Sequence, residues 1–208
     1  MSLLHSMAVQ GEPQGQVHEV LDQIQQLIRE QSGCRFHVSA TRVLLNSEAG
    51  KFLVDVPLTR WRLSATDMQI DHIETLLPSS ADMRRVADEG RPLDELLWTL
   101  AWHGSSGQLL DDCRRNDVVS FSRWPNLTRL PSDGITARVV ALMTARPSSV
   151  VLASRLLGIP EEAVAQVYSA GMKAGYATPV NRVVEAPVLK PHKHRSLIGR
   201  LMDRLQGH

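Results

Sequence analysis

The sequence predicts an α+β protein, with a small helix and β-hairpin domain followed by a more helical domain. Apolar residues recur three and four positions apart over residues 16–31, which is the pattern of an amphipathic helix. β-branched residues at about 35–45 and 51–58 flank the turn-rich stretch NSEAG, which favours a β-hairpin. From residue 135 onward, helical patterns separated by Gly and Pro follow one another closely.

The composition predicts which residues form the core and in which cellular compartment the protein is found. The chain has 208 residues, of which 43% are hydrophobic and 4% aromatic, so one large or two small domains can form around an aliphatic core. No apolar run approaches the roughly 18 residues of a membrane span, and the stretch MSLLHSMAVQGEP lacks the basic and apolar regions of a secretory signal. We therefore expect a cytoplasmic protein in which Cys34 and Cys113 are reduced thiols.

Polarity, Gly and Pro content and charge divide the chain into four parts. Residues 1–15 are polar and predicted to be disordered, and 16–130 form the α+β domain. The irregular stretch WPNLTRLPSDG separates it from a second domain over 135–186. Residues 187–208 form a basic tail.

Further elements are predicted within the first domain. SATD and SSAD fit capping boxes, which predict a short helix over 68–77 and a second helix ending at Gly90. The stretch PLDELLWTLAWHG predicts a buried helix from Pro92 to Gly104. Its residues Trp98 and Trp102 are expected to pack in the core or between the domains, and so is Trp124 further along the chain. GQLLDD and DVVSFSRW are candidate strands.

The second domain begins with ITARVVALMTA, a helical pattern. Ser148 and Ser149 are candidate caps of the next helix, which Gly158 ends, and a third helix runs from Pro160 to Gly175. The stretch YATPVNRVVEAPVL then reads as an extended wing.

This layout over residues 135–186 resembles the winged helix-turn-helix superfamily. The resemblance implies a winged-helix-like C-terminal domain whose recognition helix is Pro160–Ala174. It also implies candidate DNA contacts, which are Arg146, Arg155, Gln166, Ser169, Lys173 and Arg182.

The charges favour a different use of this domain. The implied recognition helix begins with Glu161 and Glu162, which a phosphate backbone repels, and its one lysine lies at the far end. The formal net charge is +1, but the charge is unevenly distributed. The tail carries five basic residues and one acidic residue, and the remainder of the chain is mildly acidic. Nucleic-acid binders carry the basic patch on the folded domain, so a structural or protein-binding module is favoured over a DNA-binding one.

A second resemblance concerns residues 92–110. The Leu-rich helix, polar turn and G-x-L of LDELLWTLAWHGSSGQLL are similar to bacterial adaptor domains of response-regulator and small-GTPase systems. The resemblance implies a bacterial signalling role, with a small GTPase or a response regulator as the partner. A homodimer is left open for the DNA-binding alternative.

Catalytic, cofactor and metal sites are not predicted. HGSSG lacks the spacing of a hydrolase elbow and follows a helix. Arg114 and Arg115 would lower the pKa of Cys113, but a reactive thiol also needs a placed base. Asp111, Asp112 and Asp117 lack the Gly and closing Glu of a calcium loop, so we expect a solvated acidic turn.

The tail stretch SLIGRLMDRL has one apolar stripe flanked by arginines. It is expected to fold back on the chain, to dock into a partner's groove or to lie on an anionic membrane surface. The candidate contacts are Lys193, Arg195, Leu197, Ile198, Arg200, Leu201, Met202, Arg204 and Leu205. The favoured function is a signalling or regulatory adaptor that acts through protein contacts, and the alternative is a transcription regulator.

Overall fold

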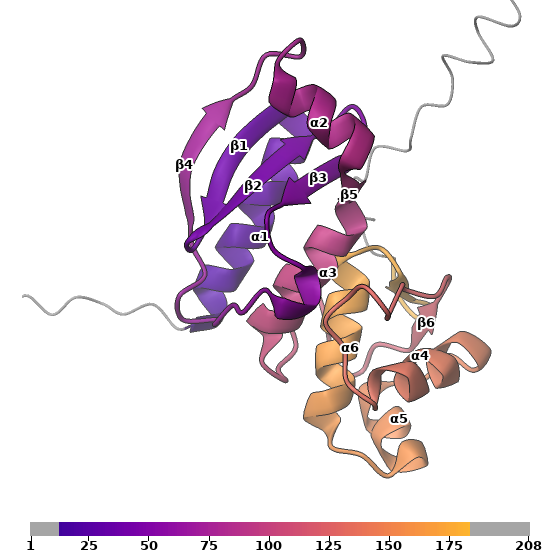
Figure 1. The fold of residues 1–208 in the computed structure, drawn as a ribbon. Coiled ribbons are helices and arrows are strands. Elements are labelled where there is room, and N and C mark those ends of the chain that lie inside the picture. Colours follow the sequence, from indigo (N-terminus) through magenta and orange to yellow (C-terminus); the bar gives the residue numbers. More distant parts are fainter. Residues whose placement is uncertain (1–12, 184–208) are drawn as a thin grey trace, which may run out of the picture.

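The fold combines a five-stranded antiparallel sheet with six α-helices and a short two-stranded ribbon over the described residues (Figure 1). The computed structural model describes residues 13–183, and the predicted tail contacts and residues 1–12 of the predicted disordered N-terminus lie outside this range. The prediction of disorder is wrong for residues 13–15, which form the start of the first helix. The N-terminal half contains α1 (Pro13–Glu30), β1 (Gly33–Val38), β2 (Thr41–Asn46), β3 (Lys51–Val54), η1 (Leu58–Arg60), β4 (Ile70–Thr75), α2 (Ala81–Glu89), β5 (Arg91–Pro92) and α3 (Leu93–Ser105). The C-terminal half contains β6 (Val119–Phe121), α4 (Thr136–Ala145), α5 (Val150–Leu157), α6 (Glu161–Lys173) and β7 (Ala177–Pro179).

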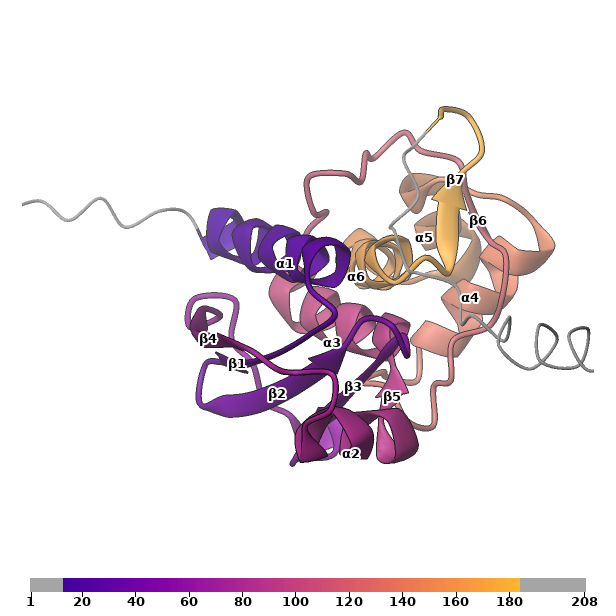
Figure 2. The same ribbon diagram turned by 90° about the horizontal axis from the view of Figure 1, so that it is seen from above.

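The sheet has the order β4-β1-β2-β3-β5, with α1 and α3 on one face and α2 on the other (Figure 2). The register explains the two faces. Phe36 pairs with Val43, so their side chains point to the same side and enter the main core with α1 and α3. Leu44, one residue along, points to the opposite side and packs with Met83 and Val86 of α2.

The predicted β-hairpin is in fact three strands, because the segment 35–45 itself turns at Ser39. Val38 pairs with Thr41, which leaves Ser39 and Ala40 as a tight turn between β1 and β2. Ser39 adopts a left-handed backbone with φ 54°, and its amide and hydroxyl bond the carbonyls of Gln69 and Asp67. Serine is common in turns but rarely has a positive φ, and alanine is not a typical turn former, so this turn depends on contacts that are distant in sequence.

The helix predicted over 68–77 is wrong, because this segment forms strand β4. Ser64 accepts a hydrogen bond from the Thr66 amide, so its side chain closes a local turn and does not cap a helix. The following residues bond the free edge of β1, where Ile70 pairs with Val38 and Thr75 with Cys34. The long-range strand pairing overrides the local helix signal.

The other predicted helices are confirmed. Two predictions for the segment after residue 92 need correction, one for the end of a helix and one for a strand. Ser80 and Ser149 cap α2 and α5, and Gly158 ends α5 with φ 63°. The helix α3 does not end at Gly104 but continues to Ser105, and Ser106 ends it with a left-handed backbone. Gly104 lies inside the helix, where a Cβ atom would clash with Val17 of α1. GQLLDD forms turns, not a strand.

The strand β7 pairs with β6, which precedes α4, α5 and α6 in the sequence. Ser120 lies opposite Thr178, and Val119 also exchanges backbone hydrogen bonds with Ser148 in the link between α4 and α5. Within the described residues, the extended segment after α6 therefore pairs with an earlier strand and does not form a hairpin of its own. Residues on both sides of the predicted 124–134 boundary share this ribbon.

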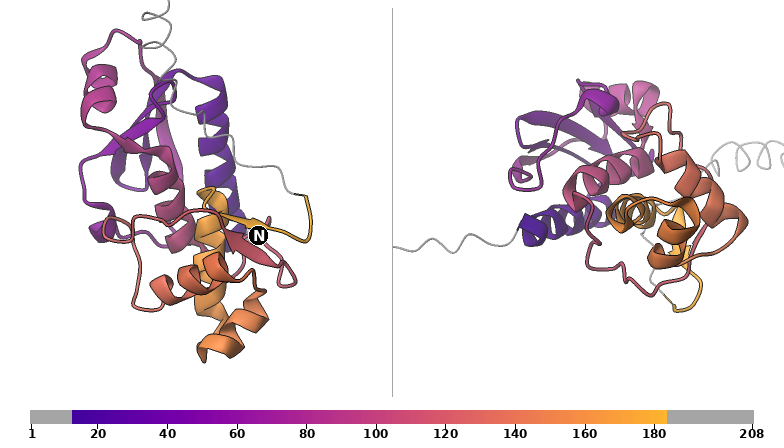
Figure 3. Two further views of the ribbon diagram at one scale, coloured as in Figure 1. Left: turned by 90° about the vertical axis from the view of Figure 1, so that its right-hand side faces the viewer. Right: turned by 90° about the horizontal axis from the view of Figure 1, so that it is seen from below.

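One apolar core runs through both halves, with α3 and α6 packed side by side at its centre (Figure 3). Trp98 and Trp102 stack with ring centroids 6.1 Å apart, and the Trp98 indole donates to the Pro131 carbonyl. Trp124, which was expected to be packed inside, is 54% exposed. The expectation was wrong for Trp124 because it lies on the outer side of the irregular crossing segment, although its neighbour Pro125 is buried.

Candidate protein-binding surface and the buried helix α6

The helix α6 occupies the position of the implied recognition helix, but it is buried on almost every side. From Val164 to Lys173 every residue except Gln166 is buried. α3 packs along it, and α4, α5 and β7 contact its other sides. A glycine is required at Gly171, where a Cβ atom would lie 2.6 Å from the Phe121 ring.

The polar side chains of α6 are bonded to other parts of the chain. Gln166 donates to the Trp102 carbonyl at 2.9 Å. Ser169 accepts from the Leu110 amide at 3.2 Å and donates to the Gln108 carbonyl at 3.3 Å. Lys173 is only 3% exposed and forms an ion pair with Asp112. Three of the six candidate DNA contacts are therefore used inside the fold.

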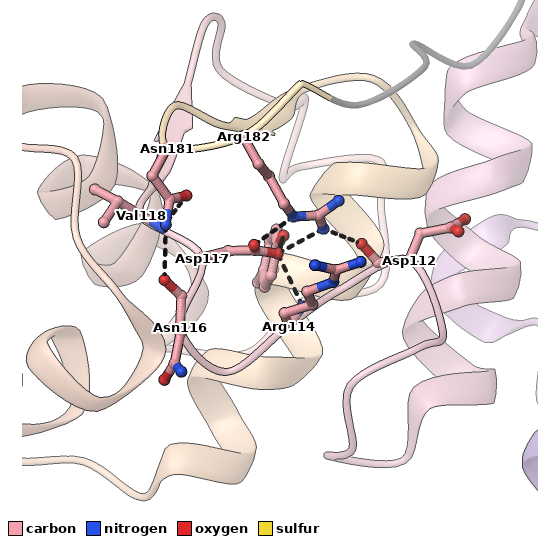
Figure 4. Close-up of polar contacts among 8 residues, drawn as sticks. Asp112, Arg114, Asn116, Asp117, Val118, Asn181 and Arg182 are labelled. Carbon is pink, nitrogen blue, oxygen red and sulfur yellow. Dashed lines mark hydrogen bonds and ion pairs between the residues drawn. The ribbon is translucent and has the colours of Figure 1, made fainter.

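A fourth candidate, Arg182, is bound to the buried carboxylate of Asp117 (Figure 4). Its Nε and Nη2 atoms lie 2.5 and 2.8 Å from the two Asp117 oxygens. Asp117 also accepts from the Tyr168 hydroxyl and from the Arg114 amide. Next to it, Asn181 accepts from the Val118 amide and donates to the Asn116 carbonyl.

These contacts define the electrostatics of the 111–118 segment. Burial raises the pKa of Asp117, but the hydrogen bonds from Arg182, Tyr168 and the Arg114 amide outweigh burial and leave this pKa below its ordinary value. Asp117 is 1% exposed, so the expected solvated acidic turn is wrong for this residue. Asp112, by contrast, has a 55% exposed side chain.

The groups that shift the pKa of Cys113 do not include Arg114 or Arg115. Burial raises the pKa of Cys113 to about 12, because a thiolate is costly where water is excluded. Burial likewise raises the pKa of Cys34 to about 12. Both cysteines are free and buried, and both are protonated at neutral pH.

The residues of HGSSG bond within their own helix. Ser105 donates to the Trp102 carbonyl and Ser106 donates to the His103 carbonyl. Burial, and then the charge of Arg62, lower the pKa of His103, so the imidazole is neutral at pH 7. Over residues 13–183, no group of three or more His, Cys, Asp or Glu side chains is arranged to hold a metal ion.

The two remaining candidates, Arg146 and Arg155, are exposed around α5. Leu152 and Leu156, on the same helix, are 40% and 50% exposed. Sequence reasoning missed the two leucines, because a Leu in an apolar helix is expected to be in the core. We call Arg138, Arg146, Leu152, Arg155 and Leu156 the α5 face.

A second surface lies on the part of the sheet that α2 leaves uncovered. A polar hollow of about 660 Å³ opens there over β1, β2 and β4. The imidazoles of His37 and His72 meet edge to face with centroids 5.5 Å apart, and the Nδ1 atom of His37 is buried without a hydrogen-bond partner. The residues that line it are Arg35, His37, Ser39, Ala40, Arg42, Asp71, His72 and Glu74.

This hollow has a mixed charge. Arg35 is paired with Glu74, and Arg42 donates to Asp55 at 2.9 Å, so both guanidinium groups already have carboxylate partners. Two of the three non-glycine residues with positive φ in the described chain, Ser39 and His72, line it. Sequence reasoning missed this surface because β4 was predicted to be a helix.

No helix of the described residues is both long and apolar enough to cross a membrane. Comparison of the whole chain with protein-family models, with curated proteins and with solved structures gave no match.

Proposed function

We propose that this chain is a regulatory adaptor that acts in the cytoplasm through protein contacts and does not insert α6 into DNA. The observation that carries the proposal is the burial of α6 together with its polar side chains. Recognition of a base edge requires side chains that are free to reach into a groove. Gln166, Ser169 and Lys173 each have a partner inside the fold, and Lys173 is only 3% exposed, so it could not reach a groove without leaving the interior.

The kind of partner is proposed from the resemblance of residues 92–110 to bacterial adaptor domains. A small GTPase or a response regulator remains the partner that this resemblance implies. The helix of that stretch, α3, is buried against α6, so its inner side stabilises the fold and the partner must be met on other surfaces. The α5 face and the polar hollow are exposed and available for this role.

DNA binding through another surface is the second candidate function. It is favoured by the exposure of Arg146 and Arg155, for which the described residues provide no ion-pair partner. Binding that neutralises several phosphates weakens steeply with salt, by a factor of about 10³ to 10⁵ between 50 and 200 mM for six to ten contacts.

A salt titration separates the two functions. The full chain would be titrated against a labelled mixed-sequence duplex by fluorescence anisotropy at low and physiological salt. We expect only weak binding at low salt and none at physiological salt. Tight binding that Arg155→Glu abolishes, while the matched variant Arg60→Glu on the other half leaves it intact, would overturn the proposal in favour of a DNA-binding protein.

A further inference from the structure

The outer side of α5 exposes two leucines that the core does not use. Leu152 and Leu156 are one helical turn apart and therefore lie on the same side of the helix. The inner side of α5 is already packed, because Val150 and Ala153 are buried. In Figures 1 and 3, α5 lies at the end of the molecule remote from the sheet, and it packs against α4 and α6.

The charge around these leucines has a single sign. Residues 134–160 contain three arginines and no acidic residue. Arg155 lies on α5 between the two leucines, and Arg138 reaches the helix end by donating to the Leu157 carbonyl at 2.8 Å. Arg146 lies in the link that leads into α5.

The acidic residues that flank this segment along the chain are Asp133, Glu161 and Glu162. One carboxylate oxygen of Asp133 accepts from the Ile135 and Thr136 amides and from the Thr136 hydroxyl at the start of α4. Glu161 forms an ion pair with Arg115 at 2.8 Å. The Cβ of Glu162 would lie 3.1 Å from a Cβ built at Gly107, so this side chain leaves its helix beside the turn after α3. None of the three acidic residues forms an ion pair with an arginine of the α5 face in the described part of the chain.

We infer that the α5 face docks an acidic, apolar-anchored segment of a partner protein. The inference rests on the proposed function and identifies the surface through which the adaptor binds its partner. Exposed leucines provide apolar area that a phosphate backbone cannot use, which favours a protein over a nucleic acid. A second copy is disfavoured, because a symmetric contact would bring the same arginines together. An amphipathic helix with carboxylates beside its apolar stripe matches both features.

A designed peptide provides the test. It would be about 15 residues long, with leucines one turn apart and glutamates at the remaining positions, so that it becomes helical on contact. Binding to the full chain would be followed by fluorescence anisotropy of the labelled peptide. We expect saturable binding that weakens with salt, and no binding of the matched peptide in which lysine replaces every glutamate.

Variants of the α5 face then assign the site. The double variant Leu152→Ser/Leu156→Ser should weaken peptide binding by about tenfold or more, and Arg155→Glu should weaken it as well. Leu77→Ser is the matched control, since Leu77 is 73% exposed on the other half of the molecule. Thermal melts of each variant establish that it is folded.

Four outcomes would overturn the inference. The first is that the acidic peptide does not bind, and the second is that the serine double variant binds it as well as the unchanged chain does. The third is that duplex DNA binds to the same face, with a loss on Arg155→Glu and none on the serine substitutions, which overturns the proposed function too. A protein partner that binds the serine double variant normally would overturn the inference alone.

Discussion

At the scale of single residues, Asp117 joins parts of the chain that are distant in sequence. Its carboxylate binds Tyr168 and Arg182, which lie 51 and 65 residues further along. Both contacts are with a carboxylate that is almost fully buried. A buried charge of this kind stabilises a fold only while its partners are present, because removal of one partner leaves the other without compensation.

Asp117→Ala should therefore destabilise the protein by about 3 kcal/mol, the typical cost of breaking a buried pair. The free energy of unfolding would be measured by urea titration. Asp111→Ala is the matched control, since the Asp111 side chain is 64% exposed, and we expect a change of at most about 0.5 kcal/mol. An equal effect of the two substitutions would show that the Asp117 contacts do not stabilise the fold.

The lowered pKa of Asp117 predicts sensitivity to acid. Burial raises this pKa, but the bonds from Arg182 and Tyr168 lower it further than burial raises it. The contribution is complete above the ordinary aspartate pKa of about 3.9 and is lost as the pH falls through the lower folded-state value. Urea titrations from pH 6 downward should show a smaller acid-induced loss in Asp117→Ala than in the unchanged chain, and parallel profiles would refute this.

Glu95 predicts the opposite dependence. Burial raises its pKa in spite of the attraction of Arg129 and Arg91, so the folded state disfavours the charged form. Stability from this group is present below the ordinary glutamate pKa of about 4.3 and is lost as the pH rises through the folded-state value. The free energy of unfolding of Glu95→Gln, relative to that of the unchanged chain, should rise from pH 4 to pH 7. A constant difference over this range would contradict the expectation.

At the scale of secondary structure, the contact between α1 and α3 depends on a glycine. A Cβ atom at Gly104 would lie 2.2 Å from a methyl group of Val17. Gly104→Ala gains about 1 kcal/mol in helix propensity, but overpacking costs about 1–3 kcal/mol. We expect a net loss of stability in thermal or urea unfolding.

Two further variants test the cause of that loss. Val17→Ala removes the methyl groups that clash, so the double variant Gly104→Ala/Val17→Ala should be more stable than the sum of the two single changes predicts. Gly134→Ala is the control, because a Cβ atom there would meet nothing within 4 Å. A destabilisation by Gly104→Ala that Val17→Ala does not reduce would exclude the packing explanation.

Elements with local signals could be predicted from the sequence. The helices α2 and α5 begin at serines whose hydroxyls accept from an amide three residues on, and α5 ends at a left-handed glycine. These interactions lie within a few residues, and the sequence displays them. The strand β4 could not be predicted in this way, because the edge of β1 stabilises it from more than 30 residues away.

The candidate site shows the same limit. Sequence reasoning could select Lys173 and Arg182 as basic residues on a helix and its following arm. It could not show that Asp112 and Asp117 bind them, because these contacts span 61 and 65 residues. Sequence reasoning found Arg146 and Arg155 of the α5 face. It missed Arg138 and the two leucines, because their exposure depends on how α4 and α5 pack on α6.

At the scale of the whole molecule, a single apolar core connects the two halves. It includes Val17 of α1, Phe36 of the sheet, Leu97 of α3 and Tyr168 of α6. The surface between α3 and α6 is thus an interior of the fold, and neither half can bury its apolar residues without the other.

Thermal unfolding should accordingly be a single cooperative transition. We expect the calorimetric and van't Hoff enthalpies of the full chain to agree, as they do for a two-state unit. A chain that ends at residue 130 should lack cooperative unfolding, since it loses the partner of α3. Two separate transitions in the full chain would instead indicate independent domains.

The pairing of β6 with β7 also has a consequence for the nascent chain. Synthesis at roughly 5–20 residues per second brings β6 out of the ribosome several seconds before β7. Val119 can first bond Ser148, and only later does Ser120 pair with Thr178 and Asp117 bind Arg182. The β6 edge and the carboxylate of Asp117 therefore remain exposed to water until β7 and Arg182 have left the ribosome. A ribosome that stalls before residue 177 leaves a chain with an open strand edge, which is the kind of edge that recruits other chains.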